Sequence, residues 1–290
     1  PAVIEAALAD AVADPVRMIA GHLPERPTGR VVVVCAGKAS ARMAEGGGSQ
    51  LGPLHGLVIA RYGYGRRCDG IEVVEAAHPV PDAAGLAATD RMLSLLSGLG
   101  PDDFVLALIS GGASAVLVAP VEGVTLAEKQ AVNAVRKHLS RVKGGRLATT
   151  ARPARMPALM ISDVPGDDPA LIGSGPTVGD PSTPAERLAI PARWQMPVPA
   201  SVTAALLRPG GVMAPGDAWL ARVENRVIAA PAQSLAAAAD LARAAGCSVE
   251  VLDARIECEA RDVAREHAAL ALSGRTTGCA GPLLLLSAVS

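Results

Sequence analysis

Short apolar runs rich in Val, Ile and Leu alternate along the chain with longer segments that are typical of helices. Continuous apolar runs of this kind are typical of strands that are buried on both faces of a parallel sheet. The strands that we expect are residues 31–35, 56–60, 71–75, 104–109, 158–162, 226–230, 248–252 and 283–287. The helices that we expect are residues 3–22, 38–45, 84–97, 126–133, 184–190, 199–207, 232–245 and 257–273.

This alternation predicts an α/β fold of the Rossmann-like, doubly wound kind, with a mainly parallel sheet and helices on both faces. Such sheets bind their ligands at the carboxyl ends of the strands. Three of the expected strands end in polar loops, which are residues 36–40, 110–114 and 162–168. We therefore expect these loops to form a ligand site.

The loop after strand 104–109 is the strongest candidate for binding an anion. Its sequence is Ser110-Gly111-Gly112-Ala113-Ser114, and a helix can begin at residues 115–118. Free backbone N–H groups at the start of a helix attract negative charge, and glycine lets a phosphate come close. A tight turn that binds nothing is the alternative interpretation.

Charged residues follow the other two strands. Lys38 comes just after the first strand, and lysine supplies a compact point charge. Asp163 follows strand 158–162, where an acid can hold Mg²⁺ or cap a turn, and Asp167 can cap a short helix. One glycine-rich, one basic and one acidic loop together suggest a phosphate-handling enzyme.

A dense group of cations lies further along the chain. Residues 136–146 include Arg136, Lys137, Lys143 and Arg146. A solvated helix face is the usual explanation for such a run, but a Gly-Gly pair interrupts the helix here, so that the cations can converge beside the loops. His78 follows another strand, in a proline-rich loop, and is either a site residue or a turn residue.

Composition narrows the class of protein. A chain of 290 residues can bury a large core, as one domain or two. The formal net charge of −1 gives no general attraction to nucleic acid or to an anionic membrane. We see no apolar run long enough to span a membrane and no signal peptide. Five scattered cysteines fit free thiols in the cytoplasm.

Several known motifs are missing from the sequence. The Gly37-Lys38 pair lacks the upstream glycine spacing of a P-loop, and no G-x-G-x-x-G fingerprint follows a strand. The segment around Ser114 lacks the last glycine of a hydrolase nucleophile elbow, so a serine nucleophile is not expected.

Several segments together resemble the glycerate 2-kinase family, whose members carry a C-terminal MOFRL domain and are sometimes labelled hydroxypyruvate reductases. They run in the family's order through most of the chain. The matching segments are residues 36–39, 75–85, 108–115, 129–133, 135–140, 143–147, 161–169 and 174–177.

The resemblance implies an enzyme that transfers a phosphoryl group from ATP to the 2-hydroxyl of D-glycerate, with Mg²⁺, to give 2-phosphoglycerate and ADP. ATP and D-glycerate would be its partners, and a homodimer is compatible with the sequence. The alternatives are a non-catalytic protein that binds a nucleotide or phosphosugar on the same scaffold and, less favoured, a hydroxypyruvate reductase. The missing dinucleotide fingerprint argues against hydride transfer.

In the reaction that we favour, each candidate residue has a role. The expected catalytic residues are Lys38, which neutralises charge on the transferred group, and Asp163, which holds Mg²⁺ with Asp167. The residues expected to bind the nucleotide are Ser110, Gly111, Gly112, Ser114, Gly175 and Thr177. The residues expected to bind the substrate are His78, Arg136, Lys137, Lys143 and Arg146. Whether the nucleotide lies on the Ser110 loop or on the Asp163 loop is left open.

Two departures from the family pattern concern the length of the chain. A helix and turn of the family are missing after Asn133, and the apolar run that ends at Leu286 resembles the family's entry into the MOFRL domain. We therefore expect a first domain over residues 1–280, and a remnant of the smaller second α/β domain over residues 281–290.

Overall fold

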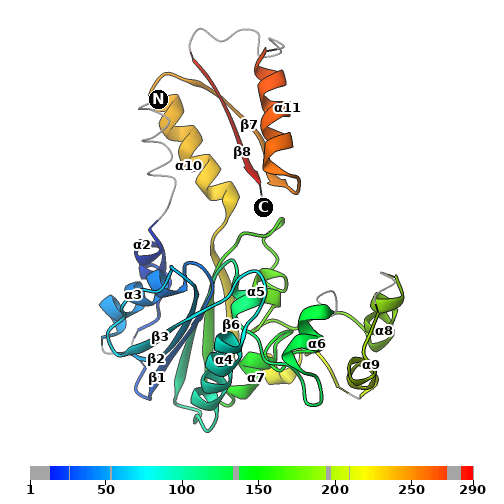
Figure 1. The fold of residues 1–290 in the computed structure, drawn as a ribbon. Coiled ribbons are helices and arrows are strands. Elements are labelled where there is room, and N and C mark those ends of the chain that lie inside the picture. The colour runs from blue at the N-terminus through cyan, green and yellow to red at the C-terminus, as the bar shows by residue number, and fades with distance from the viewer. Residues whose placement is uncertain are drawn as a thin grey trace. The chain divides into compact units, whose positions relative to one another are not determined.

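The computed structural model describes residues 14–25, 27–52, 54–132, 137–193, 197–208, 210–272 and 282–289. The chain forms two compact units (Figure 1). The larger contains residues 15–161 and 169–228, and the smaller takes in residues 162–168 and the chain from residue 229 onward. The domain boundary expected after residue 280 stays a prediction.

The larger unit contains a six-stranded sheet in the order β3-β2-β1-β4-β5-β6. The neighbouring pairs from β3 through β5 are parallel, which confirms the predicted α/β class with a mainly parallel sheet. The strands are β1 (Val31–Ala36), β2 (His55–Arg61), β3 (Ile71–Ala76), β4 (Phe104–Ile109), β5 (Met156–Ile161) and β6 (Val223–Ala229).

Apolar residues bury this sheet on both faces. Val33 and Cys35 of β1 pack in one core cluster with Met43 of helix α3. Val32 and Val34 point to the opposite face, because successive side chains of a strand alternate, and they are buried as well. The helices and turns of this unit are α2 (Pro15–Ala20), α3 (Ser40–Leu51), α4 (Ala83–Leu96), α5 (Ala113–Val116), α6 (Leu126–Ala131), α7 (Arg146–Thr150), η2 (Ile172–Ser174), α8 (Pro184–Arg193), α9 (Ala200–Leu207) and η3 (Ala218–Leu220).

The smaller unit has a sheet of its own. Strands β7 (Ser248–Ile256) and β8 (Leu283–Val289) pair in parallel, with helices α10 (Pro231–Ala244) and α11 (Ala260–Leu272) (Figure 1). Ala238 of α10 packs against Leu286 of β8. The two strands form where the apolar runs predict them, but they do not join the main sheet.

The observed elements follow the predicted ones in order, but several differ. Helix α3 extends to Leu51 rather than to residue 45, and η2 and η3 were not expected. Of the helix expected over residues 3–22, the structure describes only α2 at its end, and residues 1–13 lie outside the described part. The short helix α7 was not expected, since its start coincides with the cationic run. No helix in the described part of the chain has the length and apolarity needed to cross a bilayer.

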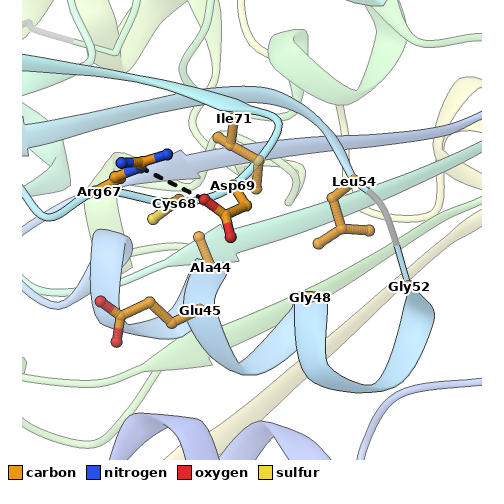
Figure 2. Close-up of a pocket in the computed structure, with 9 residues that line it drawn as sticks. All are labelled: Ala44, Glu45, Gly48, Gly52, Leu54, Arg67, Cys68, Asp69 and Ile71. Atoms are coloured by element: carbon orange, nitrogen blue, oxygen red, sulfur yellow. Dashed lines mark ion pairs between the residues drawn. The ribbon is translucent and has the colours of Figure 1, made fainter.

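A pocket of about 540 Å³ lies at the edge of the main sheet where β2 and β3 begin (Figure 2). Ala44 and Gly48 of α3 form one wall, and Leu54 and Ile71 at the strand starts form another. Arg67 and Asp69 also line this pocket, with 3.5 Å between Nε and Oδ1 (Figure 2). The pocket therefore lies at the edge opposite the carboxyl ends of the strands.

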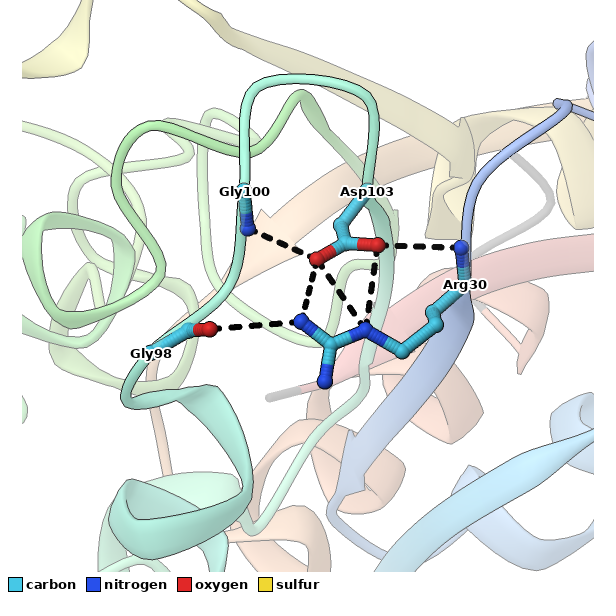
Figure 3. Close-up of polar contacts among 4 residues, drawn as sticks. All are labelled: Arg30, Gly98, Gly100 and Asp103. Carbon is cyan, nitrogen blue, oxygen red and sulfur yellow. Dashed lines mark hydrogen bonds and ion pairs between the residues drawn. The ribbon is translucent and has the colours of Figure 1, made fainter.

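At that same amino edge, an ion pair joins the starts of the two central strands (Figure 3). Asp103 precedes β4 and accepts hydrogen bonds from Nη2 of Arg30 at 2.5 Å and from the backbone N–H of Arg30 at 3.0 Å. The N–H of Gly100 donates to Oδ2 of Asp103 at 2.7 Å, and Nη2 of Arg30 also donates to the carbonyl of Gly98 at 3.2 Å. The carboxylate thus fixes the entry into β1 against the entry into β4.

We expect Asp103→Asn to lower the thermal midpoint of unfolding more than Glu224→Gln does. Glu224 forms a comparable pair with Arg155, but both side chains are about half exposed (47% and 49%). Hydrogen bonds from Arg30 hold the pKa of Asp103 well below its ordinary value. This stabilisation is therefore present above about pH 4 and is lost as the pH falls toward the native pKa. Thermal unfolding of the three proteins between neutral and acid pH tests this, and an equal loss in both variants at neutral pH would contradict it.

Candidate functional site

The candidate site begins where the strand order of the main sheet reverses, at the carboxyl ends of β1 and β4. Open α/β sheets bind ligands at this topological switch point. The N–H of Lys38 donates to the carbonyl of Gly111 at 2.8 Å, and the N–H of Ala39 donates to Oγ of Ser110 at 3.0 Å. A Cβ on Gly37 would lie 2.4 Å from the carbonyl oxygen of Ser110. The two loops are therefore locked together.

Gly112 brings Lys38 and His78 to one point. Its φ of 85° is in the left-handed region, which favours glycine. A Cβ on Gly112 would lie 3.2 Å from Cγ of Lys38 and 3.2 Å from Cδ2 of His78. The absence of a side chain at this position therefore lets the lysine, the histidine and the loop meet.

A buried lysine forms a second part of the site. The side chain of Lys143 is 1% exposed, and its Nζ donates to the carbonyl of Ser114 at 2.5 Å and to Oγ of Ser114 at 3.0 Å. Oγ of Ser114 also lies 2.7 Å from Oγ of Ser174. We did not predict a role for Ser174, although it opens the family-like segment 174–177 and lies between two glycines.

The loop after Lys143 packs on the turn that contains Ser174. The N–H of Gly144 donates to the carbonyl of Ser174 at 3.2 Å, and the N–H of Gly145 donates to that of Gly175 at 2.8 Å. Thr177 is fully buried, and its Oγ1 donates to Oδ1 of Asn225 at 2.6 Å. Gly175 therefore lies next to the loop that follows Lys143, whereas the hydroxyl of Thr177 is already hydrogen-bonded to Asn225.

Of the predicted substrate-binding cations, Lys137 and Arg146 both lie near His138, whereas Lys143 bonds Ser114. Lys137 forms an ion pair with Asp180. Burial raises the pKa of Asp180, but hydrogen bonds from Lys137 and Ser182 outweigh that effect and lower it. Arg146 donates from Nε to the carbonyl of Gly211 at 2.5 Å and from Nη1 to that of Ser140 at 2.6 Å. Arg136 lies outside the described residues.

The predicted metal ligands belong to the smaller unit. Asp163 is exposed, whereas Oδ1 of Asp167 is buried and has no hydrogen-bond partner in the described structure. Asp167 also has a φ of 55°, a conformation that aspartate tolerates better than most residues. Among the described residues, no group of three or more His, Cys, Asp or Glu side chains is arranged to hold a metal. A metal here would therefore need ligands from the substrate or water.

Comparison with known proteins gives a consistent family. Residues 2–207 match the family model described as "Domain of unknown function (DUF4147)". A "Putative hydroxypyruvate reductase" from Agrobacterium vitis is 44% identical over 98% of this chain and 68% of its own length. A "D-glycerate 2-kinase" from Thermotoga maritima is 36% identical over 87% of this chain and 63% of its own.

The solved structures agree with these relatives. The crystal structure of a glycerate kinase from Thermotoga maritima superposes with a TM-score of 0.83 and 33% sequence identity. The likeness covers 99% of this chain and 73% of that one.

We expect Gly112→Ala to destabilise the protein more than Gly216→Ala. Both glycines have a φ near 80° (85° and 77°), so alanine costs about 1 kcal/mol of backbone strain at either position. A Cβ on Gly216 meets nothing within 4 Å, whereas one on Gly112 presses on Lys38 and His78. Urea unfolding of the two variants measures the difference, and equal free energies of unfolding would show that the contact among these residues is loose.

Proposed function

We propose, from the premise that this chain belongs to the glycerate kinase family (DUF4147), that it transfers the γ-phosphoryl group of ATP to the 2-hydroxyl of D-glycerate. The products would be 2-phosphoglycerate and ADP. The observation that carries the proposal is the meeting of Lys38, His78 and the Gly112 loop at the switch point of the sheet.

The Ser110 loop suits the nucleotide phosphates. The N–H groups of Gly111 and Gly112 bond no protein acceptor in the described part of the chain, so they are available to an anion. Ser114, which takes hydrogen bonds from buried Lys143, closes this loop toward Gly175. Phosphoryl transfer depends mainly on positioning and on neutralising charge, and backbone N–H groups beside a lysine provide both.

Lys38 would neutralise charge on the transferred phosphoryl group. In the reaction the bond from the γ-phosphorus to the ADP oxygen breaks, and a bond to the 2-hydroxyl oxygen of glycerate forms as that hydroxyl loses its proton. His78 lies beside Lys38 and would contact the acceptor there. Lys137, Arg146 and Arg136 would favour the carboxylate of glycerate through their charge.

Asp163 and Asp167 would hold Mg²⁺. The orphaned and buried Oδ1 of Asp167 fits a cation, since carboxylate oxygens are the ligands that Mg²⁺ prefers. Magnesium commonly uses only one or two carboxylates together with substrate phosphates, which agrees with an acidic pair. When bound, the ion would neutralise charge on the phosphate oxygens.

The proposal includes a cytoplasmic location. Cys35, Cys68, Cys247 and Cys258 are free thiols in the described structure, which supports a reducing compartment.

We expect Lys38→Ala to lower kcat for glycerate phosphorylation by about 10²–10³-fold, because the transition state loses a charge-stabilising donor. The thermal midpoint should change little, since Lys38 is only half-buried. Arg91→Ala, which removes a surface ion pair with Glu72, is the matched control and should keep full activity. Coupled measurement of ADP release tests the three proteins, and activity of Lys38→Ala within about threefold of the parent would remove the role of Lys38.

Further measurements beside this assay distinguish the proposed kinase from the alternative functions. A binding protein would take up Mg-ATP in calorimetry without turning over glycerate. The name of the Agrobacterium vitis relative favours a reductase as the second candidate. Oxidation of NADH or NADPH by hydroxypyruvate, with no ADP release from glycerate, would establish that function instead. Identification of the phosphorylated carbon by NMR tests the 2-phosphoglycerate product.

We expect Asp163→Asn to raise the Mg²⁺ concentration needed for half-maximal activity by about tenfold or more, the usual scale for a disturbed metal site. Asp69→Asn is the control, since its side chain is 94% exposed and lies at the other edge of the main sheet. A Mg²⁺ titration of both variants measures the effect. If both variants needed the same Mg²⁺ concentration for half-maximal activity, Asp163 would not be a metal ligand.

A further inference from the structure

A buried polar cluster contains two residues to which no role has been assigned above. His138 and Arg187 are 8% and 6% exposed, and each has one polar atom without a partner in the described structure. These atoms are Nδ1 of His138 and Nε of Arg187. A buried polar atom without a hydrogen bond is costly, so two of them in one cluster indicate that something binds there.

The hydrogen bonds around His138 fix its neutral tautomer. Oγ of Ser182 donates its one proton to Oδ1 of Asp180, so it must accept from Nε2 of His138, which lies 3.1 Å away. The neutral ring therefore carries its proton on Nε2 and leaves a bare lone pair on Nδ1. Protonation of the ring would turn Nδ1 into a donor.

Positive charge exceeds negative charge around this histidine. The charged groups that act on it are Asp180, Arg187, Arg146 and Lys137. The Asp180 carboxylate is paired with Lys137. The two arginines donate to backbone carbonyls instead, Arg187 to Gly210 and Arg208, and Arg146 to Gly211 and Ser140. Buried Arg187 and half-buried Arg146 thus have no carboxylate partner in the described structure, and poorly solvated charge of this kind favours an anion.

Gly211 lies close to both unpartnered groups. A Cβ on this residue would lie 2.7 Å from Nη1 of Arg187 and 3.9 Å from Nδ1 of His138. Its φ of 148° lies at the edge of the region that favours glycine. The histidine and the guanidinium therefore approach the same glycine, where a side chain would press on Arg187.

We propose that His138 and Arg187, with Arg146 beside them, form a site for a small oxyanion, either a carboxylate or a tetrahedral phosphate-like group. Nε of Arg187 and the protonated Nδ1 of His138 are its two donors. None of these three residues belongs to the Ser110 loop (residues 110–114). The proposal concerns binding alone and holds whether or not the chain is a kinase.

The rival occupant is a single water molecule, and the two occupants differ in their proton requirement. A water can accept from Arg187 and donate to the neutral Nδ1, so it needs no protonated histidine. An oxyanion accepts from both groups and therefore requires the charged ring. Burial, reinforced by the neighbouring cations, lowers the pKa of His138 below its ordinary value in the empty site. Binding of an oxyanion must therefore raise that pKa and take up a proton from solvent.

The test is calorimetric titration of the whole protein with sulfate and, separately, with D-glycerate. Neither probe changes its own charge between about pH 6 and 8. As the pH rises from the pKa of His138 in the empty site to its pKa in the filled site, we expect the affinity for the anion to fall about tenfold per pH unit. Titrations in buffers of different ionisation enthalpy should reveal the uptake of one proton. Preference for glycerate identifies a carboxylate site, and preference for sulfate identifies a phosphate-like site.

Three variants test whether the proton taken up on anion binding goes to this cluster. His138→Gln keeps a donor for Ser182 but loses Nδ1, so it should abolish the proton uptake and weaken binding at least tenfold at pH 6. His55→Gln, an exposed histidine at the start of β2, is the matched control and should change nothing. Lys38→Ala should keep the uptake, even where it stops catalysis.

Three results would overturn the proposal. If the unmodified protein bound the anion without taking up a proton, a water molecule and not the anion would occupy the space between His138 and Arg187. Unchanged binding and proton uptake in His138→Gln would place the anion elsewhere. Loss of all proton-linked binding in Lys38→Ala would assign the anion to the Ser110 loop. Loss of turnover in Lys38→Ala with retained proton uptake would instead support both proposals independently.

Discussion

The hydrogen bonds between the loop after β1 and the loop after β4 are the contact on which the candidate site depends. The backbone of Lys38 bonds to Gly111, and the side chain of Ser110 accepts from Ala39, so neither loop can shift without the other. These hydrogen bonds can form because β1 and β4 are neighbours at the point where the strand order reverses. The Arg30–Asp103 pair fixes the same two strands at their other end. The position of the Lys38 backbone is therefore set by the register of the sheet.

The strands could be predicted from the sequence because each is a continuous apolar run in a buried sheet. The same runs carry no information about which sheet a strand joins, and β7 and β8 accordingly form a separate pair. The loops that carry Lys38 and Ser110 were also predicted, since glycine and polar residues end the strands abruptly. Ser174, His138 and Arg187 were not assigned roles, because their partners are distant in sequence and only the folded chain brings them together.

Lysine and arginine have different tasks around the site. Lys143 bonds one serine, through both its hydroxyl and its carbonyl, and Lys38 extends beside Gly112. Arg146 and Arg187 instead use their planar forks to hold several carbonyls of residues 208–211. This division fits the geometry of the two groups, since a guanidinium can bridge neighbouring acceptors and an ammonium acts as a point charge. Lys38 and Lys143 therefore each supply a compact charge next to the Ser110 loop.

The smaller unit is assembled from segments that are far apart in the sequence. Its acidic segment, residues 162–168, is flanked on both sides by chain that belongs to the larger unit. The N–H of Ser162 donates to the carbonyl of Ala229 at 2.8 Å. During synthesis on the ribosome, Asp163 and Asp167 emerge long before that partner strand and the helices that follow it. The nascent chain can complete the joined loops of Lys38 and Ser110 early, but its acidic loop must wait until Ala229 and the residues after it have been made.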